Sequence, residues 1–171
     1  MIRAYKGMRP TLGLRAFVDS SAQVIGAVDL GEDASVWMNT VVRGDVNRIR
    51  IGARTNVQDN CVLHVTAQHP TTLAEDVTVG HSVTLHGCTI ENLCLIGMGS
   101  IILNGARIGE GSIIAAGSLV PEGTVVPPRS LFMGMPAQFR RHLTDDDLRI
   151  IRRYSQNYLG YKDSYLAATK R

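Results

Sequence analysis

Apolar residues recur at every sixth position over most of this chain. From Val18 the sequence divides into units such as VDSSAQ, VIGAVD and LGEDAS, each with an apolar leading residue. The fifth position of each unit is small or β-branched, as at Ala22, Val28 and Ala34. The last run is unbroken from Ile90 to Phe132, and its eight apolar leading residues would arise by chance in about one frame in a thousand. The six-residue pattern is therefore a genuine repeat.

A period of six residues matches neither the 3.6-residue turn of an α-helix nor the two-residue alternation of a strand. It is typical of a β-helix, in which each unit forms one short strand and one corner. The leading residue points inward, and the fifth residue must be small to fit a narrow prism. A β-sandwich of short strands is the alternative, but its strands would not stay in phase over this length.

The C-terminal part of the chain follows a helical pattern instead. Thr144 is a good N-cap, and three aspartates follow it where a helix N-terminus favours negative charge. Apolar and aromatic residues then recur at helical spacing: Ile150, Tyr154, Tyr158, Tyr161 and Tyr165. We predict one domain over residues 1–171, with a β-helix over about 12–139 and an outer helix over about 144–166.

Composition narrows the function classes. A chain of 171 residues with a net charge of +3 gives no strong case for a nucleic acid or a membrane surface as partner. No stretch approaches the roughly 20 apolar residues of a membrane span, and MIRAYKGMRP lacks the apolar core of a signal peptide. Three cysteines without CxxC spacing argue against a disulfide framework, so we expect a cytoplasmic protein.

The repeat loses phase at three places, and polar residues with catalytic potential gather there. The spacing changes from six to nine between Val42 and Ile51, to ten between Leu63 and Leu73, and to five between Leu85 and Ile90. Loops interrupt the stack at such points, and loops often carry function. Arg43, Asp45, His64 and His86 each lie within three residues of one of these changes. The sequence therefore predicts a site in this region.

Two histidines are predicted to share one column. If three units make a coil, Leu85 lies one coil above Leu63, so His64 and His86 follow equivalent leading residues about 4.8 Å apart. Two imidazoles at that spacing can bind one zinc ion. His81 is third in its unit, on the preceding face, and is predicted to reach an ion held by a neighbouring subunit. His69 and His142 are expected at the surface.

At these residues the chain resembles the γ-class carbonic anhydrases and their bacterial homologues, some of which are called ferripyochelin-binding proteins. The resemblance covers nearly the whole length, and its most specific segments are TNVQDNCVLH and VGHSVTLHG. It implies a left-handed parallel β-helix and a homotrimer. It also implies a zinc ion, with iron or cobalt as other candidates, on residues that match the family's ligands: His64, His81 and His86.

The resemblance also implies supporting roles and a reaction. Gln58 would hydrogen-bond the water on the metal, while Asp59 and Asn56 would lie in or behind the pocket. Arg43 and Asp45 would form an ion pair across the subunit interface. A tyrosine or asparagine of the C-terminal helix would approach the metal, with Tyr158 favoured over Tyr154 and Asn157. The implied reaction is the reversible hydration of carbon dioxide to bicarbonate.

Two departures from the family pattern bear on turnover. Val46 follows Arg43-Gly44-Asp45 where the founding archaeal enzyme has a glutamate of its proton relay. The acidic loop that carries a shuttle glutamate is replaced by TAQHPTTLAED, in which His69 is a candidate shuttle. Fast hydration needs a proton path to solvent, so these departures predict weak activity or none.

Two other function classes remain open. The segment Gly134-Met135-Pro136-Ala137 resembles the terminal coil of hexapeptide acyltransferases, so acyl transfer or metal-assisted acyl-CoA thioester hydrolysis is one alternative. An acyltransferase has no use for three metal-binding histidines, which argues against transfer more than against hydrolysis. A catalytically silent metal-binding subunit is the other alternative.

Overall fold

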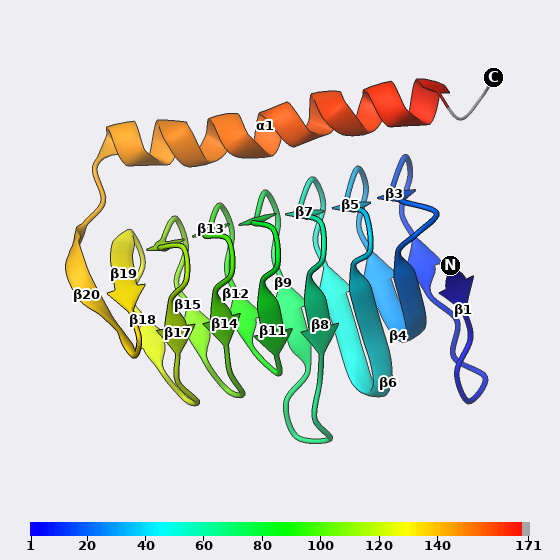
Figure 1. Cartoon of the computed structure of the whole chain (residues 1–171), viewed down its shortest axis with the longest axis horizontal. Helices are drawn as coiled ribbons and strands as arrows, with labels where there is room; N and C mark the ends of the chain where they lie inside the picture. Colours follow the sequence, from blue (N-terminus) through cyan, green and yellow to red (C-terminus); the bar gives the residue numbers. More distant parts are fainter. Residues whose placement is uncertain (169–171) are drawn as a thin grey trace.

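The computed structural model describes residues 1–168 of the chain, which fold into a left-handed parallel β-helix with one α-helix laid along its outside (Figure 1). Successive coils stack through parallel pairs in which the leading residues face one another, such as Leu63 with Leu85 and Leu85 with Ile102. The predicted fold class is confirmed. Within this part of the chain no helix is long and apolar enough to cross a lipid bilayer.

Two faces of the prism form one continuous sheet, because two long strands turn the corner between them. These strands are β4 (Gln23–Leu30) and β6 (Val41–Ile51). The face that we call the β8 face continues with β8 (Val62–His64), β11 (Thr84–His86), β14 (Ile101–Ile102) and β17 (Leu119–Val120). The β9 face continues with β9 (Thr71–Leu73), β12 (Thr89–Ile90), β15 (Arg107–Ile108) and β18 (Val125–Val126). At the N-terminal end β1 (Ile2–Arg3) and β2 (Thr11–Leu12) pair with β4.

The third face, which we call the β7 face, is a separate sheet. Its strands are β3 (Phe17–Val18), β5 (Ser35–Val36), β7 (Asn56–Val57), β10 (Thr78–Val79), β13 (Leu95–Ile96), β16 (Ile113–Ile114), β19 (Ser130–Gly134) and β20 (Ala137–His142). The last pair, β19 and β20, is antiparallel and closes the C-terminal end of the stack.

The core of the prism is built from the residues that the repeat places inside. Leading residues such as Leu63, Leu85 and Ile102 are completely buried, as the pattern predicted. Most fifth positions are buried too, including Cys61 and Cys94, because only a small side chain fits where two faces meet. Cys88 is likewise buried in this core.

The outer surfaces of the three faces differ in chemistry. The β9 face is polar, with Arg50, Thr72, Thr89 and Arg107 beside its inward residues. The β8 face is apolar and uncovered within one chain. Its outward side chains include five apolar residues, of which Val62 is 43% and Ile101 36% exposed: Val41, Val62, Ile101, Leu103 and Leu119.

The β7 face is covered by α1 (Asp145–Ala168), which returns along the whole stack and brings the described C-terminal end back to the N-terminal coils (Figure 1). Thr144 caps this helix: its backbone N–H donates to Asp147 Oδ2 at 2.8 Å, and the N–H of Asp147 donates to Thr144 Oγ1 at 3.3 Å. The helix thus begins where the sequence predicted and ends two residues later. Trp37, an outward residue of the β7 face, is only 5% exposed beneath it.

The helix follows one column of corner residues, all with left-handed backbone: Arg15, Asp33, Arg54, Asp76, Leu93, Gly111 and Arg129. Asp145 pairs with Arg129, Ile151 packs on Leu93, and Lys162 binds Asp33. Six coil steps of about 4.8 Å span about 29 Å. The 18 residues from Asp145 to Asp163, which binds Arg15, rise about 27 Å. One turn of the helix therefore advances along the prism by about the height of one coil.

Candidate functional site

His64 and His86 lie side by side on the β8 face, as their shared column predicted. Their backbones are paired between β8 and β11, and His64 Nδ1 lies 3.1 Å from His86 Nε2. The two ring centroids are 5.1 Å apart. Both side chains are partly buried.

Neighbouring acceptors determine which ring nitrogens carry protons. His64 Nε2 lies 3.0 Å from Asp45 Oδ1, and an ionised carboxylate can only accept, so this nitrogen is the donor. Burial alone would raise the pKa of Asp45, but hydrogen bonds from His64 and Arg43 bring that pKa below its ordinary value. The neutral His64 ring is therefore unprotonated at Nδ1.

His86 is fixed in the same way by Asn104. His86 Nδ1 lies 2.7 Å from Asn104 Oδ1. Asn104 Nδ2 donates to Glu122 Oε1 at 2.5 Å, which fixes the orientation of the amide. The carbonyl oxygen thus faces His86, whose Nδ1 must be the donor and whose Nε2 is unprotonated. When both rings are neutral, two lone pairs point at each other across 3.1 Å, an arrangement that a shared cation would stabilise.

The residue after His86 must be glycine for Asn104 to approach the ring of His86. Gly87 has a φ of 62°, and a Cβ on it would lie 2.7 Å from both Asn104 Oδ1 and the Cβ of His69. His69 is exposed on the loop beside Asn104, at the surface as expected.

His81 lies elsewhere on the same chain, in the turn between β10 and β11. Its Nδ1 is 2.9 Å from Asp59 Oδ2, which leaves Nε2 as the unprotonated nitrogen of a neutral ring. The side chain is 44% exposed. Thus all three predicted ligands have one nitrogen beside an oxygen acceptor and the other available as a donor of electrons to a metal.

A single chain does not bring the three histidines together. Within residues 1–168 no group of three or more His, Cys, Asp or Glu side chains is arranged to hold a metal ion. The shared metal site with His64, His81 and His86 therefore stays a prediction.

Gln58 and Asn56 form a buried polar pair beside His81. Gln58 Nε2 donates to Asn56 Oδ1 at 3.1 Å, and Asn56 Nδ2 donates to Thr78 Oγ1 at 2.9 Å. Gln58 is 5% exposed and Asn56 is 1% exposed. Because its amide nitrogen is engaged, Gln58 has its carbonyl oxygen available to accept a hydrogen bond.

Arg43 and Asp45 form an ion pair within one chain. The resemblance implied a pair across a subunit interface, and that pair stays a prediction. The two residues are two positions apart on β6, so both point to the same side of the strand. Asp45 thus links Arg43 to His64 within one subunit.

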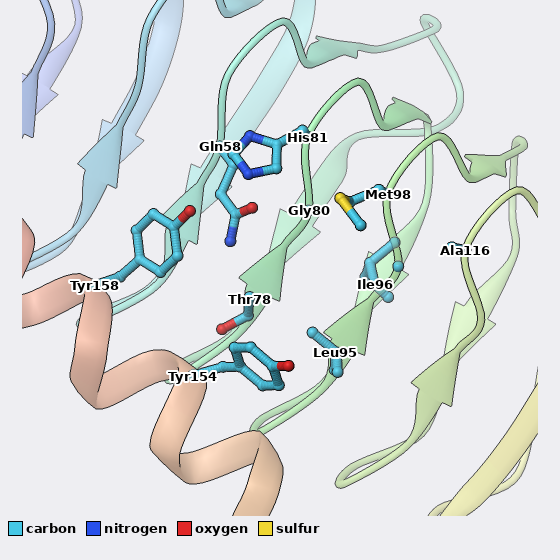
Figure 2. Close-up of a pocket in the computed structure, with 11 residues that line it drawn as sticks. Gln58, Thr78, Gly80, His81, Leu95, Ile96, Met98, Ala116, Tyr154 and Tyr158 are labelled. Atoms are coloured by element: carbon cyan, nitrogen blue, oxygen red, sulfur yellow. The ribbon is translucent and has the colours of Figure 1, made fainter.

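A cavity of about 260 Å³ lies between α1 and the β7 face, and Figure 2 shows the side chains around it. Gln58 and His81 are at one side, Tyr154 and Tyr158 project from α1, and the far side is apolar, with Leu95 and Met98 among its residues.

Burial raises the pKa of Tyr158 to about 12, with a further contribution from the charge of Asp59. Tyr158 lines this cavity as the helical pattern allowed, together with Tyr154; Asn157, the other helix residue considered, does not line it.

Sequence reasoning missed Asn104 and Glu122. They lie on the two coils above His86, and Asn104 comes two residues after the leading Ile102. The register would have placed Asn104 beside Gly87, but an asparagine in the segment ILNGAR also reads as a simple turn residue.

The comparisons define the class of protein. Residues 87–122 match the family model described as Bacterial transferase hexapeptide (six repeats). Protein YrdA of Escherichia coli K12 is 47% identical over 97% of this chain and 94% of its own length. A carbonic anhydrase of Geobacillus kaustophilus is 47% identical over 98% and 92% of the two chains. Gamma carbonic anhydrase 1 of Arabidopsis mitochondria is 40% identical over 92% of this chain and 60% of the plant protein. The chain is a hexapeptide-repeat protein.

Within that class, the chain belongs to the γ-class carbonic anhydrase family. Solved structures share its fold closely. The BC4754 gene product of Bacillus cereus, provisionally described as an acetyltransferase, has a TM-score of 0.96 at 47% identity, over 98% of this chain and 97% of that one. A hexapeptide-repeat acetyltransferase of Vibrio cholerae in complex with acetyl coenzyme A has a TM-score of 0.58 at 28% identity, over 67% and 70% of the two chains. The architecture therefore serves more than one chemistry.

Proposed function

We propose that this protein is a γ-type carbonic anhydrase that interconverts carbon dioxide and bicarbonate at a zinc site shared between subunits of a trimer. The observation that carries this proposal is the approach of His64 Nδ1 to His86 Nε2 at 3.1 Å, both unprotonated in the neutral rings. Two nitrogens bound to one tetrahedral zinc ion, each at 2.0–2.1 Å, are about 3.4 Å apart. The distance of 3.1 Å between His64 Nδ1 and His86 Nε2 is therefore close to the distance between two nitrogens that bind one zinc ion.

The donor set also fits a catalytic ion. Three neutral imidazoles leave a fourth coordination position open, as catalytic zinc sites require. A zinc ion in such a site acts as a Lewis acid that lowers the pKa of water to about 7. Asp45, Asn104 and Asp59 each hold one of the histidines in the tautomer that binds a metal.

The residues around the cavity beside His81 can bind and orient the substrate. Gln58 presents an acceptor oxygen without adding charge, which suits the orientation of a nucleophile toward carbon dioxide. The apolar side chains of Leu95 and Met98 can accommodate an uncharged linear molecule. Tyr158 remains a neutral phenol at physiological pH, because its pKa is raised to about 12. It can therefore donate a hydrogen bond to a bicarbonate oxygen.

A second copy of the chain supplies His81. The apolar β8 face carries His64 and His86, and its exposed Val62 and Ile101 favour contact with another protein surface. His81 stands at the corner between the β7 and β8 faces with an exposed side chain. Three-fold packing of prisms, β8 face against the neighbour's corner, brings the His81 of one chain to the histidine pair of the next.

The first test combines metal analysis with stopped-flow measurement of carbon dioxide hydration on the full-length protein. We expect one ion per subunit, with both metal and hydration lost in His64→Ala and His86→Ala. His142→Ala, a change at an exposed histidine far along the chain, is the matched control and should retain both. Protein that is purified without chelators or oxygen and still contains no metal would contradict the proposal.

The shared site is tested by subunit mixing. Trimers of His64→Ala alone or of His81→Ala alone have no complete site. Co-expression of the two variants should restore roughly a quarter of the wild-type sites, because one subunit then supplies His81 and its neighbour the pair. A mixture that stays without bound metal would show that the histidines do not combine across subunits.

Metal-assisted hydrolysis of an acyl thioester is the second candidate. The cavity of about 260 Å³ beside His81 is larger than carbon dioxide needs, and its far side is apolar, as a short acyl chain would require. Assay of the zinc-loaded protein with acetyl and hexanoyl coenzyme A separates the two functions. Thioester cleavage without hydration would favour this candidate, and hydration without cleavage would favour the first.

A further inference from the structure

A second cavity lies under the C-terminal half of α1 and is walled by aromatic rings. Its volume is about 310 Å³, at the lower end of the range of about 300–1,000 Å³ for small-molecule sites. Four of its seven lining residues are aromatic: Trp37, Tyr158, Tyr161 and Tyr165. Met38, Asp59 and Ser164 complete the wall. We call this site the aromatic cage; it touches the cavity beside His81 only through Tyr158.

The rings are held nearly perpendicular to one another. Trp37 lies 5.3 Å from Tyr158 at 85° and 5.3 Å from Tyr165 at 86°, and Tyr158 lies 5.4 Å from Tyr161 at 79°. The indole is fixed because its Nε1–H donates to Ser35 Oγ at 3.0 Å and its ring packs on Phe17. The three tyrosines share one side of α1 at spacings of three and four residues. The walls are therefore preorganised.

The charge of the cage is negative. Asp59 is the one charged residue among its seven described lining residues. Its carboxylate oxygen Oδ2 lies 2.9 Å from Nδ1 of His81. The faces of tryptophan and tyrosine rings carry a negative potential that attracts cations. A cavity with four such rings, one carboxylate and neither lysine nor arginine among its described lining residues is complementary to a small cation.

We propose that the aromatic cage binds a methylated ammonium compound, of the size of choline or tetramethylammonium. A primary ammonium group carries three N–H donors that each need an acceptor, and the cage is mainly ring surface. A quaternary ammonium group has no N–H to satisfy, so ring faces and one carboxylate meet all its requirements. The volume of the cavity fits such a headgroup.

Fluorescence provides a direct measurement, because Trp37 is the only tryptophan of the chain. Titration of the full-length protein with choline should change its emission with a saturable curve. The neutral isostere 3,3-dimethylbutan-1-ol, which has the same shape without the charge, should bind at least about tenfold more weakly. Isothermal calorimetry checks that the signal is binding. Equal affinity for both compounds, or no saturation by choline at millimolar concentration, would overturn the proposal.

Substitutions at Tyr161 separate a binding site from ordinary helix packing. Tyr161 is 53% exposed, so its replacement leaves the core intact. Tyr161→Leu should weaken choline binding at least about threefold, while Tyr161→Phe, which keeps the ring face, should leave it unchanged. Unchanged binding in Tyr161→Leu would show that the rings only hold the helix on the prism. Circular dichroism confirms that both variants are folded.

Discussion

At the scale of single residues, the protonation of the two histidine rings depends on side chains that bind the ring nitrogens facing away from the metal position. Asp45 and Asn104 each accept a hydrogen bond from one ring and so determine which nitrogen is free to bind a metal. Outer partners of this kind commonly change metal affinity by about 10–100-fold.

The replacement Asn104→Leu tests this role. It removes the acceptor for His86 Nδ1, so the ring can adopt the tautomer that is protonated at Nε2. We expect the affinity for zinc to fall by about 10–100-fold, measured by competition with a chromophoric chelator. Asn92→Leu is the control, since the Asn92 side chain accepts from the backbone of Glu75 at an exposed turn and contacts no histidine. An equal loss in both variants would point to a general defect of the coil.

Val46 bears on the rate of proton transfer. It follows Asp45 on β6 and is 58% exposed. A carboxylate at this position would reach solvent, but valine has no group that accepts a proton. If proton release limits hydration, an increase in imidazole buffer from 5 to about 50 mM should raise kcat, because a soluble base replaces the missing one. Val46→Glu should raise kcat at low buffer, and Val46→Gln, equal in size without a titrating group, should not. Buffer-independent turnover in the wild type would contradict this account.

The three buried cysteines should lower the free energy of unfolding as the pH rises above 9. Burial raises the pKa of Cys61, Cys88 and Cys94 to about 12, against 9 as the ordinary value. The unfolded thiols ionise above pH 9 while the folded ones stay protonated, so their stabilisation is complete below pH 9 and lost as the pH rises toward 12. Three thiols contribute a slope of up to about 4 kcal/mol per pH unit.

Urea unfolding between pH 8 and 10.5 measures that slope. Cys61→Ala should reduce it by about 1.4 kcal/mol per pH unit, and alanine suits a fifth position, as at Ala22 and Ala34. An unchanged slope in Cys61→Ala would mean that tyrosine and lysine ionisation dominates.

At the scale of elements, the helix and the prism have matched repeats. The coil rise of about 4.8 Å and the helical pitch of about 5.4 Å are close enough for α1 to meet a new corner residue at nearly every turn. This match positions Tyr154 and Tyr158 over the cavity beside His81, and Tyr161 and Tyr165 over the aromatic cage.

Lys162 is the strongest polar attachment of α1. Its side chain is 1% exposed, and its Nζ lies 2.6 Å from Asp33 Oδ1 and 2.7 Å from Asp163 Oδ1. Lys162→Ala should lower the free energy of unfolding by about 2 kcal/mol, less than for a fully buried pair because Asp163 is half exposed. The hydrogen bond from Lys162 lowers the pKa of Asp33, so this contribution is present above pH 4 and lost as the pH falls further.

Chemical denaturation at pH 7 and pH 3 checks both statements. Arg153→Ala, at an exposed position of the same helix, should change the stability by less than about 0.5 kcal/mol. If Lys162→Ala behaves like Arg153→Ala at pH 7, the helix is held by its apolar contacts alone.

At the scale of the whole molecule, the contrast between the β8 and β9 faces determines where another subunit can dock. Val62 and Val125 are both outward and exposed, at 43% and 67%. Val62 lies on the apolar β8 face, whereas Val125 pairs with Arg107 on the polar β9 face.

We therefore expect Val62→Glu to dissociate the proposed trimer and to abolish the proposed metal binding, and Val125→Glu to change neither. Sedimentation velocity and metal analysis of both variants measure these effects. A wild-type protein that sediments as a monomer and still binds metal would contradict assembly through the β8 face.

The sequence by itself determined the fold. The six-residue period resumes after each change of spacing and allows one placement of each inward residue, which is why the column of His64 and His86 was predicted correctly and is confirmed by the pairing of β8 with β11. The start of the helix also followed from local signals, since Thr144 caps its own helix.

What only the tertiary structure decided are the contacts between side chains that lie far apart in the sequence. Asn104 reaches His86 across a coil, and Trp37 meets Tyr165 only because α1 returns along the prism (Figure 1). Periodicity specifies on which face a residue lies, but the rotamer that a side chain adopts depends on neighbours one coil away or on a distant helix. The ion pair of Arg43 with the Asp45 of its own chain likewise depends on rotamers that the repeat does not specify.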